Sequence, residues 1–244
     1  MNSRPGPSFQ PLYLQIKDLL TQSLDTGEWK PGAAIPSEMV LAARYKVSQG
    51  TVRKAIDALA AGNLVVRRQG KGTFVATHTE EKSSMFRFLR IRRGDGIDEY
   101  PHSRLIDLRR GKASAEVGRL LSLRPGEAVV ILRRVLEYSG EPVVLDEITL
   151  PAALFKGLTR ARYDAYRGST YSFFETQFGV RMVRADERIK AIAADASSAK
   201  ILNVASGTPL LAVERVTYTY GNRPVEWRRG LCTTKNHYYS NQLG

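Results

Sequence analysis

The sequence predicts a two-domain α+β protein. At 244 residues the chain exceeds one typical domain, and hydrophobic residues make up 43% of it, which is enough for packed cores. Helical periodicity dominates residues 9–78, whereas residues 85–244 are typical of antiparallel strands with helices between them. The polar stretch 79–84 lacks periodicity and is expected to be a linker.

Three helices are predicted in the first domain. Apolar residues recur at helical spacing across residues 11–26. Ser37 suits the N-cap of a second helix, at about 38–45, and Ser48 suits that of a third, at about 49–61. Because only about three residues separate the second helix from the third, the pair has the spacing of a helix-turn-helix.

A β-hairpin is predicted to follow the third helix. Two short β-prone runs, 64–68 and 73–76, flank the glycine-rich tip 69–72. A hairpin directly after two closely spaced helices indicates a wing. The first domain, residues 9–78, is therefore predicted to be a winged helix-turn-helix.

The third helix carries the side chains expected to bind DNA. In a helix-turn-helix the start of its outward face enters the major groove. There Arg53 can donate two hydrogen bonds to a guanine and Gln49 can pair with an adenine, while Ser48 and Thr51 suit phosphate. Glycines allow close approach, and Lys71 at the wing tip neutralises a phosphate. The predicted DNA-binding residues are Ser48, Gln49, Gly50, Thr51, Arg53, Gln69, Gly70, Lys71 and Gly72.

The charge of the chain favours a polyanionic partner. The formal net charge is +13 and the isoelectric point is near 10.0, which by itself indicates only a nucleic acid. Together with the predicted winged helix-turn-helix, it leads us to expect double-stranded DNA as the partner. No apolar run approaches the roughly 18 residues that cross a bilayer, and residues 1–10 lack a secretory apolar segment. We therefore expect a protein that lies in the cytoplasm, associates with the nucleoid and binds no membrane.

The cysteine and histidine residues indicate neither a disulfide nor a metal site. Cys232 is the only cysteine, which excludes an intramolecular disulfide, and it is expected to be a small packed residue. His78, His102 and His237 are far apart in sequence and have no ligand spacing. We expect no metal and no other cofactor.

A weak internal repeat organises the second domain. Each copy is predicted to hold a short helix, a glycine turn, a strand, a hairpin turn and a second strand. Between the copies we predict a helix over 169–178, closed by Gly179, and a strand over 180–192. The shared order of elements favours duplication over chance. Eight positions recur 81 residues later: Ala115, Leu120, Leu123, Gly126, Leu132, Arg134, Val135 and Gly140 become Ala196, Ile201, Val204, Gly207, Val213, Arg215, Val216 and Gly221.

Five short motifs carry a family resemblance in the first domain. They are Pro11-Leu-Tyr-Leu-Gln-Ile16, Pro36-Ser-Glu38, Val47-Ser48, Thr51-Val-Arg53 and Gly70-Lys-Gly-Thr-Phe-Val75. Over residues 9–77 the chain closely resembles the winged-helix domain of the GntR family of regulators. The resemblance implies that Ser48, Thr51, Arg53 and the wing glycines contact DNA. Met39 and Gln49 stand where many members have arginine, so the common operator of the family is not assumed.

Residues 85–244 resemble the UTRA domain of the HutC-like branch of that family, which shares its fold with chorismate lyase. The resemblance implies an antiparallel sheet that binds a small effector and supplies the dimer contact. It rests on residues 120–126, on Arg134 and Gly140-Glu-Pro142, on Ser169-Thr-Tyr171, on Phe178-Gly179 and on Pro224-Val-Glu226.

The same resemblance implies an effector site. Arg134 and the start of the helix at Ser169 both favour negative charge, so an anionic effector is expected. Leu136 replaces the second arginine of the family's pair, which argues against a phosphosugar. An alternative is that Arg134 and Glu226 are ordinary residues on a strand surface. The positions implied to contact the effector are Arg134, Asp146, Ser169, Tyr171 and Glu226.

Together these features predict a sequence-specific transcription regulator, by default a repressor. A homodimer would bind a pseudo-palindromic operator, and a small metabolite would modulate that binding. An enzyme is the first alternative, but no Ser–His–Asp order, metal-ligand cluster or phosphate loop stands out, so no catalytic residue is expected. The second alternative is an architectural or RNA-binding protein that uses its charge without sequence preference.

Overall fold

The structure is a computed structural model that describes residues 10–79 and 88–241. The described residues form two compact units, which divide between Thr77 and His78. Of the linker expected at 79–84, all but residue 79 lies outside the described residues.

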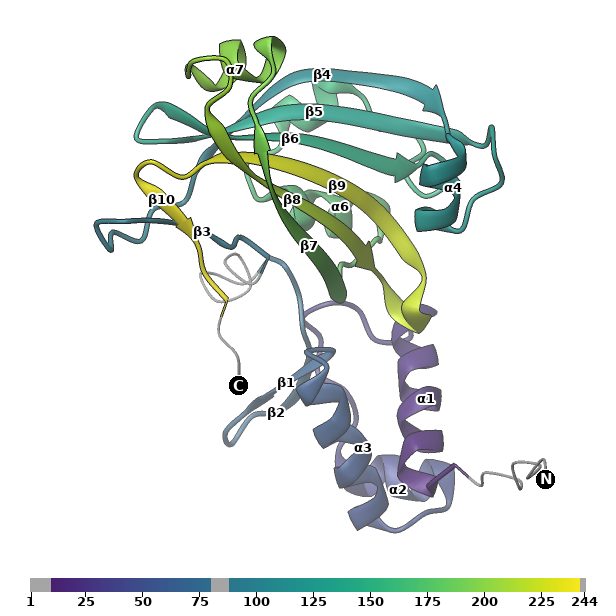
Figure 1. Cartoon of the computed structure of the whole chain (residues 1–244). Coiled ribbons are helices and arrows are strands. Elements are labelled where there is room, and N and C mark those ends of the chain that lie inside the picture. Colours follow the sequence, from purple (N-terminus) through teal and green to yellow (C-terminus); the bar gives the residue numbers. More distant parts are fainter. Residues whose placement is uncertain (1–9, 80–87, 242–244) are drawn as a thin grey trace, which may run out of the picture. The chain divides into compact units, whose positions relative to one another are not determined.

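The N-terminal unit folds as three helices and a hairpin (Figure 1). The hydroxyl of Ser37 accepts a hydrogen bond from the Val40 amide, and that of Ser48 accepts one from the Thr51 amide, which confirms both predicted N-caps. Asn63 follows α3 in the left-handed conformation, at φ 55°. The elements are α1 (Leu12–Asp25), α2 (Glu38–Tyr45), α3 (Gln49–Ala61), β1 (Val65–Arg68) and β2 (Gly72–Val75).

One apolar stripe of α3 builds the core of this unit. Val52, Ile56 and Leu59 are buried, as the helical spacing predicts, and so are Leu20 of α1 and Leu41 of α2, the helices that pack against α3. Val40, the neighbour of Leu41 on α2, is 57% exposed. Adjacent helical positions differ by about 100°, so burial of Leu41 turns Val40 toward solvent.

Among the described residues, the C-terminal unit holds a six-stranded antiparallel sheet in the order β4-β5-β6-β9-β8-β7. A separate pair joins β3 (Ile91–Arg93) to β10 (His237–Tyr239). The sheet consists of β4 (His102–Lys112), β5 (Ala128–Tyr138), β6 (Glu141–Pro151), β7 (Arg184–Ala193), β8 (Pro209–Tyr218) and β9 (Pro224–Thr233).

The sheet confirms the internal repeat and extends it. Each half runs strand, helix, strand, strand: β4-α4-β5-β6 and then β7-α7-β8-β9, with α4 at Ala115–Leu121 and α7 at Ala196–Leu202. The halves meet where β6 pairs with β9, so the order of the sheet is symmetrical about that pair. Corresponding turns match, because Gly126 and Gly207 have φ values of 83° and 84°. The strand predicted over 180–192 is β7, which begins only at Arg184, and β4 was not predicted.

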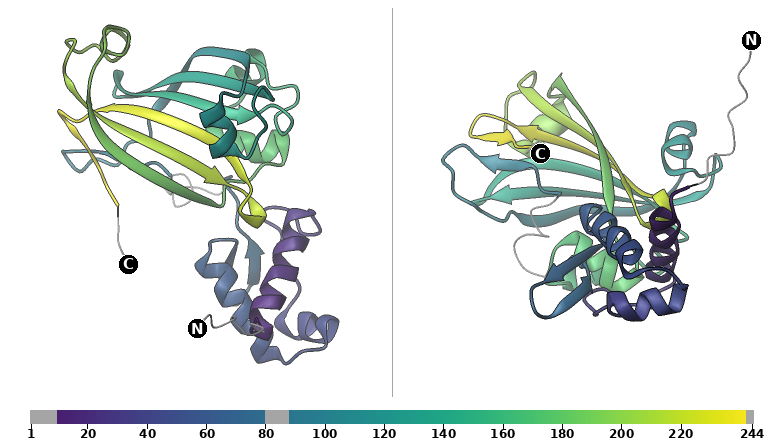
Figure 2. Two further views of the ribbon diagram at one scale, coloured as in Figure 1. Left: turned by 45° about the vertical axis from the view of Figure 1, so that its right-hand side comes forward. Right: turned by 90° about the horizontal axis from the view of Figure 1, so that it is seen from below.

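The helices cover both faces of this sheet (Figures 1 and 2). On one face, α6 (Thr170–Phe178) packs Phe173 and Phe174 against even-numbered strand residues such as Leu132 and Ile148. The short α5 (Arg160–Ala165) leads into it. On the other face, α4 and α7 cover odd-numbered positions such as Val135. Alternation along β5 and β6 therefore directs even-numbered side chains toward α6, whereas on β8 the odd-numbered Arg215 faces that side.

Candidate effector site and DNA-binding surface

The predicted DNA-binding side chains are accessible in the N-terminal unit. Ser48, Gln49, Gly50 and Arg53 are exposed at the start of α3, and Thr51 is half-buried. The wing tip, residues 69–72, is exposed in full, with Gly70 and Gly72 at positive φ. This arrangement leaves the start of α3 and the wing free to meet a duplex.

Glu38 organises the side chains on this surface. Its Oε2 accepts hydrogen bonds from Arg53 Nε at 3.0 Å and from Gln49 Nε2 at 3.4 Å. Arg67 of β1 lies between Glu38 Oε1, at 3.3 Å, and Asp57 Oδ1, at 2.7 Å. The hydrogen bond from Arg53 is the main reason that the pKa of Glu38 is lowered. Sequence reasoning treated Glu38 only as a motif residue at the start of α2.

A cavity of about 810 Å³ lies in the C-terminal unit, between the sheet and the segment that carries α5 and α6. This volume suits a small metabolite. The wall is rich in arginine and aromatic side chains, and Asp164 is the only carboxylate that lines it among the described residues. The cationic and aromatic lining residues are Arg104, Arg134, Arg160, Arg167, Arg215, Arg228, Phe88, Tyr100, Tyr163, Tyr166, Tyr171 and Phe173.

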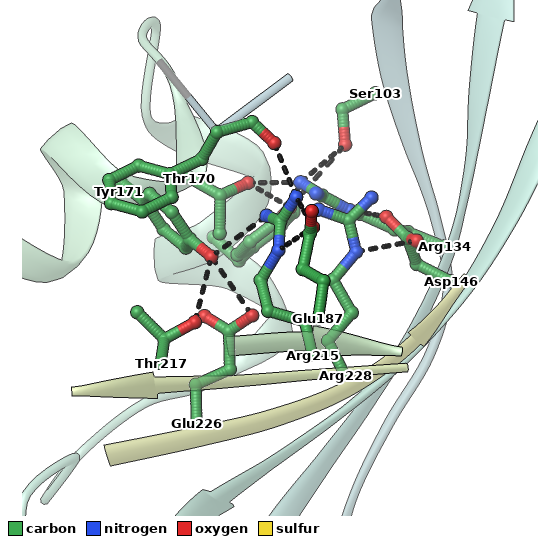
Figure 3. Close-up of polar contacts among 12 residues, drawn as sticks. Ser103, Arg134, Asp146, Thr170, Tyr171, Glu187, Arg215, Thr217, Glu226 and Arg228 are labelled. Atoms are coloured by element: carbon green, nitrogen blue, oxygen red, sulfur yellow. Dashed lines mark hydrogen bonds and ion pairs between the residues drawn. The ribbon is translucent and has the colours of Figure 1, made fainter. Parts of the chain in front are cut away.

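Two arginines of this cavity share one carboxylate (Figure 3). Arg134 Nε donates to Asp146 Oδ2 at 3.0 Å, and Arg228 Nε donates to Asp146 Oδ1 at 2.7 Å. Asp146 is fully buried and faces Gly230 across the β6–β9 pair. An added Cβ at Gly230 would lie 2.9 Å from Asp146 Oδ1, so the glycine makes room for the carboxylate. The clamp formed by Arg134, Asp146 and Arg228 is called the arginine clamp below.

Hydroxyl groups hold the other end of Arg134. Its Nη1 donates to Tyr163 Oη at 3.2 Å, to Ser103 Oγ at 3.5 Å and to Thr170 Oγ1. Burial opposes the charge on Arg134, but Tyr163 and Asp146 together raise its pKa, so it stays a cation. The guanidinium is therefore fixed in position before any ligand arrives.

Arg215 occupies the position that matches Arg134 in the second half of the sheet. Its Nε donates to Glu187 Oε1 at 2.6 Å, its Nη2 to the Phe88 carbonyl at 2.5 Å and its Nη1 to Tyr171 Oη at 3.4 Å. Tyr171 also donates to Glu226 Oε1 at 3.1 Å. Burial raises the pKa of Glu226, which favours its neutral form.

The start of α6 opens onto the same cavity. Ser169 caps the helix, since its hydroxyl accepts from the Ser172 amide at 3.1 Å. The free amides at this end favour an anion. Gly168 permits the tight approach of the chain: an added Cβ would lie 2.6 Å from Tyr166 Cε1 and 2.8 Å from Ser172 Oγ.

All five residues predicted for the effector site lie in this region. Arg134, Ser169 and Tyr171 line the cavity, whereas Asp146 and Glu226 are fully buried beside it. The alternative that Arg134 and Glu226 are strand-surface residues is wrong, because they are only 7% and 0% exposed.

Sequence reasoning missed several residues of the site. The 81-residue repeat already paired Arg215 with Arg134 and could have identified it. Arg228 lies two residues after Glu226 on β9, and only strand alternation hinted that both share a face. Thr170 appeared only as the middle residue of the Ser169-Thr-Tyr171 motif, and Tyr163 gave no distinct signal.

Cys232 is a packed residue, as expected. It is 1% exposed, and burial raises its pKa to about 12, so it is not a reactive thiolate. Within residues 10–79 and 88–241, no helix is long and apolar enough to cross a membrane.

A winged helix-turn-helix and a cavity domain in one chain define a one-component transcription regulator. The family model of the UTRA domain matches residues 98–237, and that of the bacterial regulatory proteins of the gntR family matches residues 12–75. The chain belongs to the GntR regulators that carry a UTRA domain, of the HutC-like branch. It is a DNA-binding transcription regulator with an effector-binding domain.

Named relatives agree with this assignment. The chain is 29% identical over 221 residues to the histidine utilization repressor of Pseudomonas putida, covering 90% of this chain and 86% of the relative. It is 30% identical over 223 residues to an HTH-type transcriptional regulator of Mycobacterium tuberculosis, covering 88% and 80%. A solved ligand-binding domain from Bordetella bronchiseptica, assigned to a GntR-family regulator, matches at 45% identity and a TM-score of 0.62, covering 65% of this chain and 98% of that one.

Proposed function

We propose that the protein is a homodimeric repressor that binds a pseudo-palindromic operator in the cytoplasmic nucleoid and is released by a small anionic effector. The observation that carries the effector half is the arginine clamp, fixed in a metabolite-sized cavity at the start of α6. The family supplies the DNA-binding half. The named repressor among the relatives supports the direction of control.

The geometry of the N-terminal unit supports sequence-specific binding. Arg53 is exposed on α3, and Glu38 accepts hydrogen bonds from both Arg53 and Gln49, so the two side chains that we expect to read bases share one partner. We propose that these two side chains, with Ser48, Gly50, Thr51 and the wing tip, contact the operator. Two copies of α3 would occupy half-sites about one helical turn, or roughly 34–36 Å, apart.

His78 provides a route from the cavity to the DNA-binding unit. It is the first residue of the C-terminal unit, it lines the cavity and its ring centroid lies 5.6 Å from that of Tyr171. Its amide donates to Glu175 Oε2 at 2.8 Å. A ligand that repositions Tyr171 would therefore also shift His78, which lies at the boundary between the two units in the sequence. Control then follows if the ligand prefers one arrangement of the units over the other.

We further propose that the cavity binds and does not catalyse. Asp146 and Glu187 are held in ion pairs with buried arginines, and Glu226 accepts a hydrogen bond from Tyr171. Carboxylates engaged in this way favour a fixed binding surface over proton transfer to a substrate. Turnover of a bound ligand by the purified protein would contradict this part of the proposal.

The proposed function is tested by selecting random duplexes on the full-length protein at about 150 mM salt. We expect enrichment of one inverted repeat. Arg53→Ala should weaken binding to that repeat by about 1–3 kcal/mol and relax the preference at one base pair. Lys54→Ala, the neighbouring exposed cation, is the control: it should weaken binding to all duplexes alike. Binding that shows no preferred sequence and vanishes as salt rises would instead identify a nonspecific architectural protein.

A further inference from the structure

We infer that the cavity takes a small organic monocarboxylate with an aromatic or similarly flat apolar body, and that Arg228 is the second half of its anion clamp. This inference rests on the proposed role of the cavity as the effector site. It names the class of ligand and adds a binding residue on β9.

The charge of the arginine clamp fits a monoanion. Asp146 receives one hydrogen bond from the Nε of each arginine, so two guanidinium groups share a single carboxylate. Arg215 is matched separately by Glu187. One positive charge of the clamp is therefore left for a ligand. A phosphate monoester carries about −1.5 to −2 at neutral pH, which exceeds the single positive charge of the clamp.

The donors of the clamp fit a planar group. Among the residues that the structure describes, the hydrogen bonds of Arg228 go only to Asp146 through Nε. Its two terminal nitrogens remain for a ligand, and its side chain is 13% exposed. A guanidinium edge with two parallel N–H groups matches a carboxylate in a bidentate arrangement. Arg134 stands beside it on the other oxygen of Asp146.

The place of the missing family arginine is apolar. Leu136 lines the cavity and is 3% exposed. A phosphate seated beside position 136 would therefore meet a hydrocarbon side chain.

The remaining wall favours a flat apolar body over a polyol. The rings of Tyr166 and Tyr163 pack on Phe173 at centroid distances of 5.1 and 5.6 Å, and Leu105 lines the same cavity. Flat aromatic walls bind flat ligands by stacking. Asp146 is fully buried and does not line the cavity, so its oxygens do not face a sugar hydroxyl there.

Calorimetric titration of the full-length protein tests this inference with a matched set of probes. Benzoate, phenyl phosphate and benzamide share a phenyl ring and differ in the group attached to it, which is a carboxylate, a phosphate and a neutral amide respectively. We expect benzoate to bind with millimolar or better affinity, at least about tenfold more tightly than phenyl phosphate, and benzamide not to bind. Arg228→Ala should weaken benzoate binding by about tenfold or more. Arg229→Ala, exposed at the next position of β9, should leave it unchanged.

Several other outcomes overturn the inference, and one overturns only the proposed regulator. Tighter binding of phenyl phosphate would identify a phosphate site, and full benzoate affinity in Arg228→Ala would place the ligand elsewhere. If Arg228→Ala fails to fold, Arg228→Lys keeps the ion pair with Asp146 but not the guanidinium edge, and unchanged benzoate affinity in that variant would equally refute the clamp. No binding of any probe by a protein that still selects its operator would refute the ligand class alone. Benzoate binding without operator selection would refute the proposed regulator and leave the site intact.

Discussion

The two halves of the C-terminal sheet place the same residue in two different situations. Arg134 on β5 and Arg215 on β8 are 81 residues apart, and both line the cavity. Arg134 shares its carboxylate with a second arginine, whereas Arg215 has Glu187 to itself and also donates to the Phe88 carbonyl. Duplication thus supplied two equivalent arginines, and the distribution of carboxylates decides which one is left with charge for a ligand.

The carboxylates differ because the strands that carry them differ. Asp146 lies on β6, at the centre of the sheet, where both neighbouring strands bring an arginine to it. Glu187 lies on the edge strand β7, where Tyr239 of β10 also donates to it. The central position therefore builds the arginine clamp, whereas the edge position links β8 and β10 through Glu187.

The largest expected effect is that of Arg215→Ala on stability. Arg215→Ala deletes the ion pair with the partly buried Glu187 and the hydrogen bond to the Phe88 carbonyl, so the unfolding free energy of the C-terminal unit should fall by about 3–5 kcal/mol. Denaturant unfolding of the full-length protein measures it. Arg188→Ala, an exposed arginine on β7, should change the same quantity by less than about 0.5 kcal/mol. A loss below about 1 kcal/mol in Arg215→Ala would show that the second half does not depend on this pair.

Arg134→Ala should cost less stability than Arg215→Ala but should abolish the response to the effector. Asp146 keeps Arg228, so the loss of stability should be smaller, at about 2–3 kcal/mol. The effector response should disappear, because the clamp loses one of its two guanidinium groups. The measurement is operator release by the effector, followed by fluorescence anisotropy. Arg133→Ala, at the adjacent position of β5 with its side chain on the other face, is the control. A normal response in Arg134→Ala would mean that Arg134, like Arg215, is only structural.

The N-terminal unit was the more predictable part because its signals are local. Ser37 and Ser48 fix the starts of α2 and α3 by capping, and the bounds of both helices match the prediction. The strand β4 escaped prediction because it is an edge strand with many charged residues, so apolar alternation is weak along it. Edge strands generally carry less of the pattern on which sequence prediction depends.

The site was predictable only in part, because its geometry depends on strand register. Arg134 and Tyr171 were found through family positions, and Arg215 was available from the repeat. The arginine clamp requires Arg134 and Arg228 to reach one carboxylate, and this follows from the pairing of Asp146 with Gly230 across strands 84 positions apart. Such pairings arise from tertiary structure, which no local pattern records.

Gly230→Ala tests the central position alone. The new Cβ would lie 2.9 Å from Asp146 Oδ1 and 3.6 Å from Val144 Cγ1, so the carboxylate has to shift. We expect a loss of about 1–2 kcal/mol in stability and weaker effector binding, because both arginines follow Asp146. Thermal unfolding and effector titration provide the two readouts. Unchanged effector affinity would show that the position of the carboxylate does not set that of the clamp.

The smallest expected effect is the contribution of Glu187 to the pH dependence of stability. The sign of this contribution differs between the native chain and the Arg215→Ala variant. In the native chain burial alone would raise the pKa of Glu187, but Arg215 and the Tyr239 hydroxyl lower it below the ordinary 4.5. A lowered pKa gives a contribution to stability that is present at neutral pH and is lost as the pH falls below 4.5 through the folded-state pKa. Between neutral pH and pH 4.5 this group should therefore leave the unfolding free energy unchanged.

Without Arg215, burial should dominate and raise the pKa of Glu187 above that of the unfolded chain. The folded state then binds a proton first, so the variant should regain stability relative to the native chain as the pH falls from 7 towards about 5, by about 1.4 kcal/mol for each unit of raised pKa. Unfolding at both pH values measures the change, and Glu187→Gln in the Arg215→Ala background should abolish it. If the difference in unfolding free energy between the two chains stays constant with pH, Glu187 is solvated once Arg215 is gone. In that case the edge strand β7 carries less buried charge than the central strand β6.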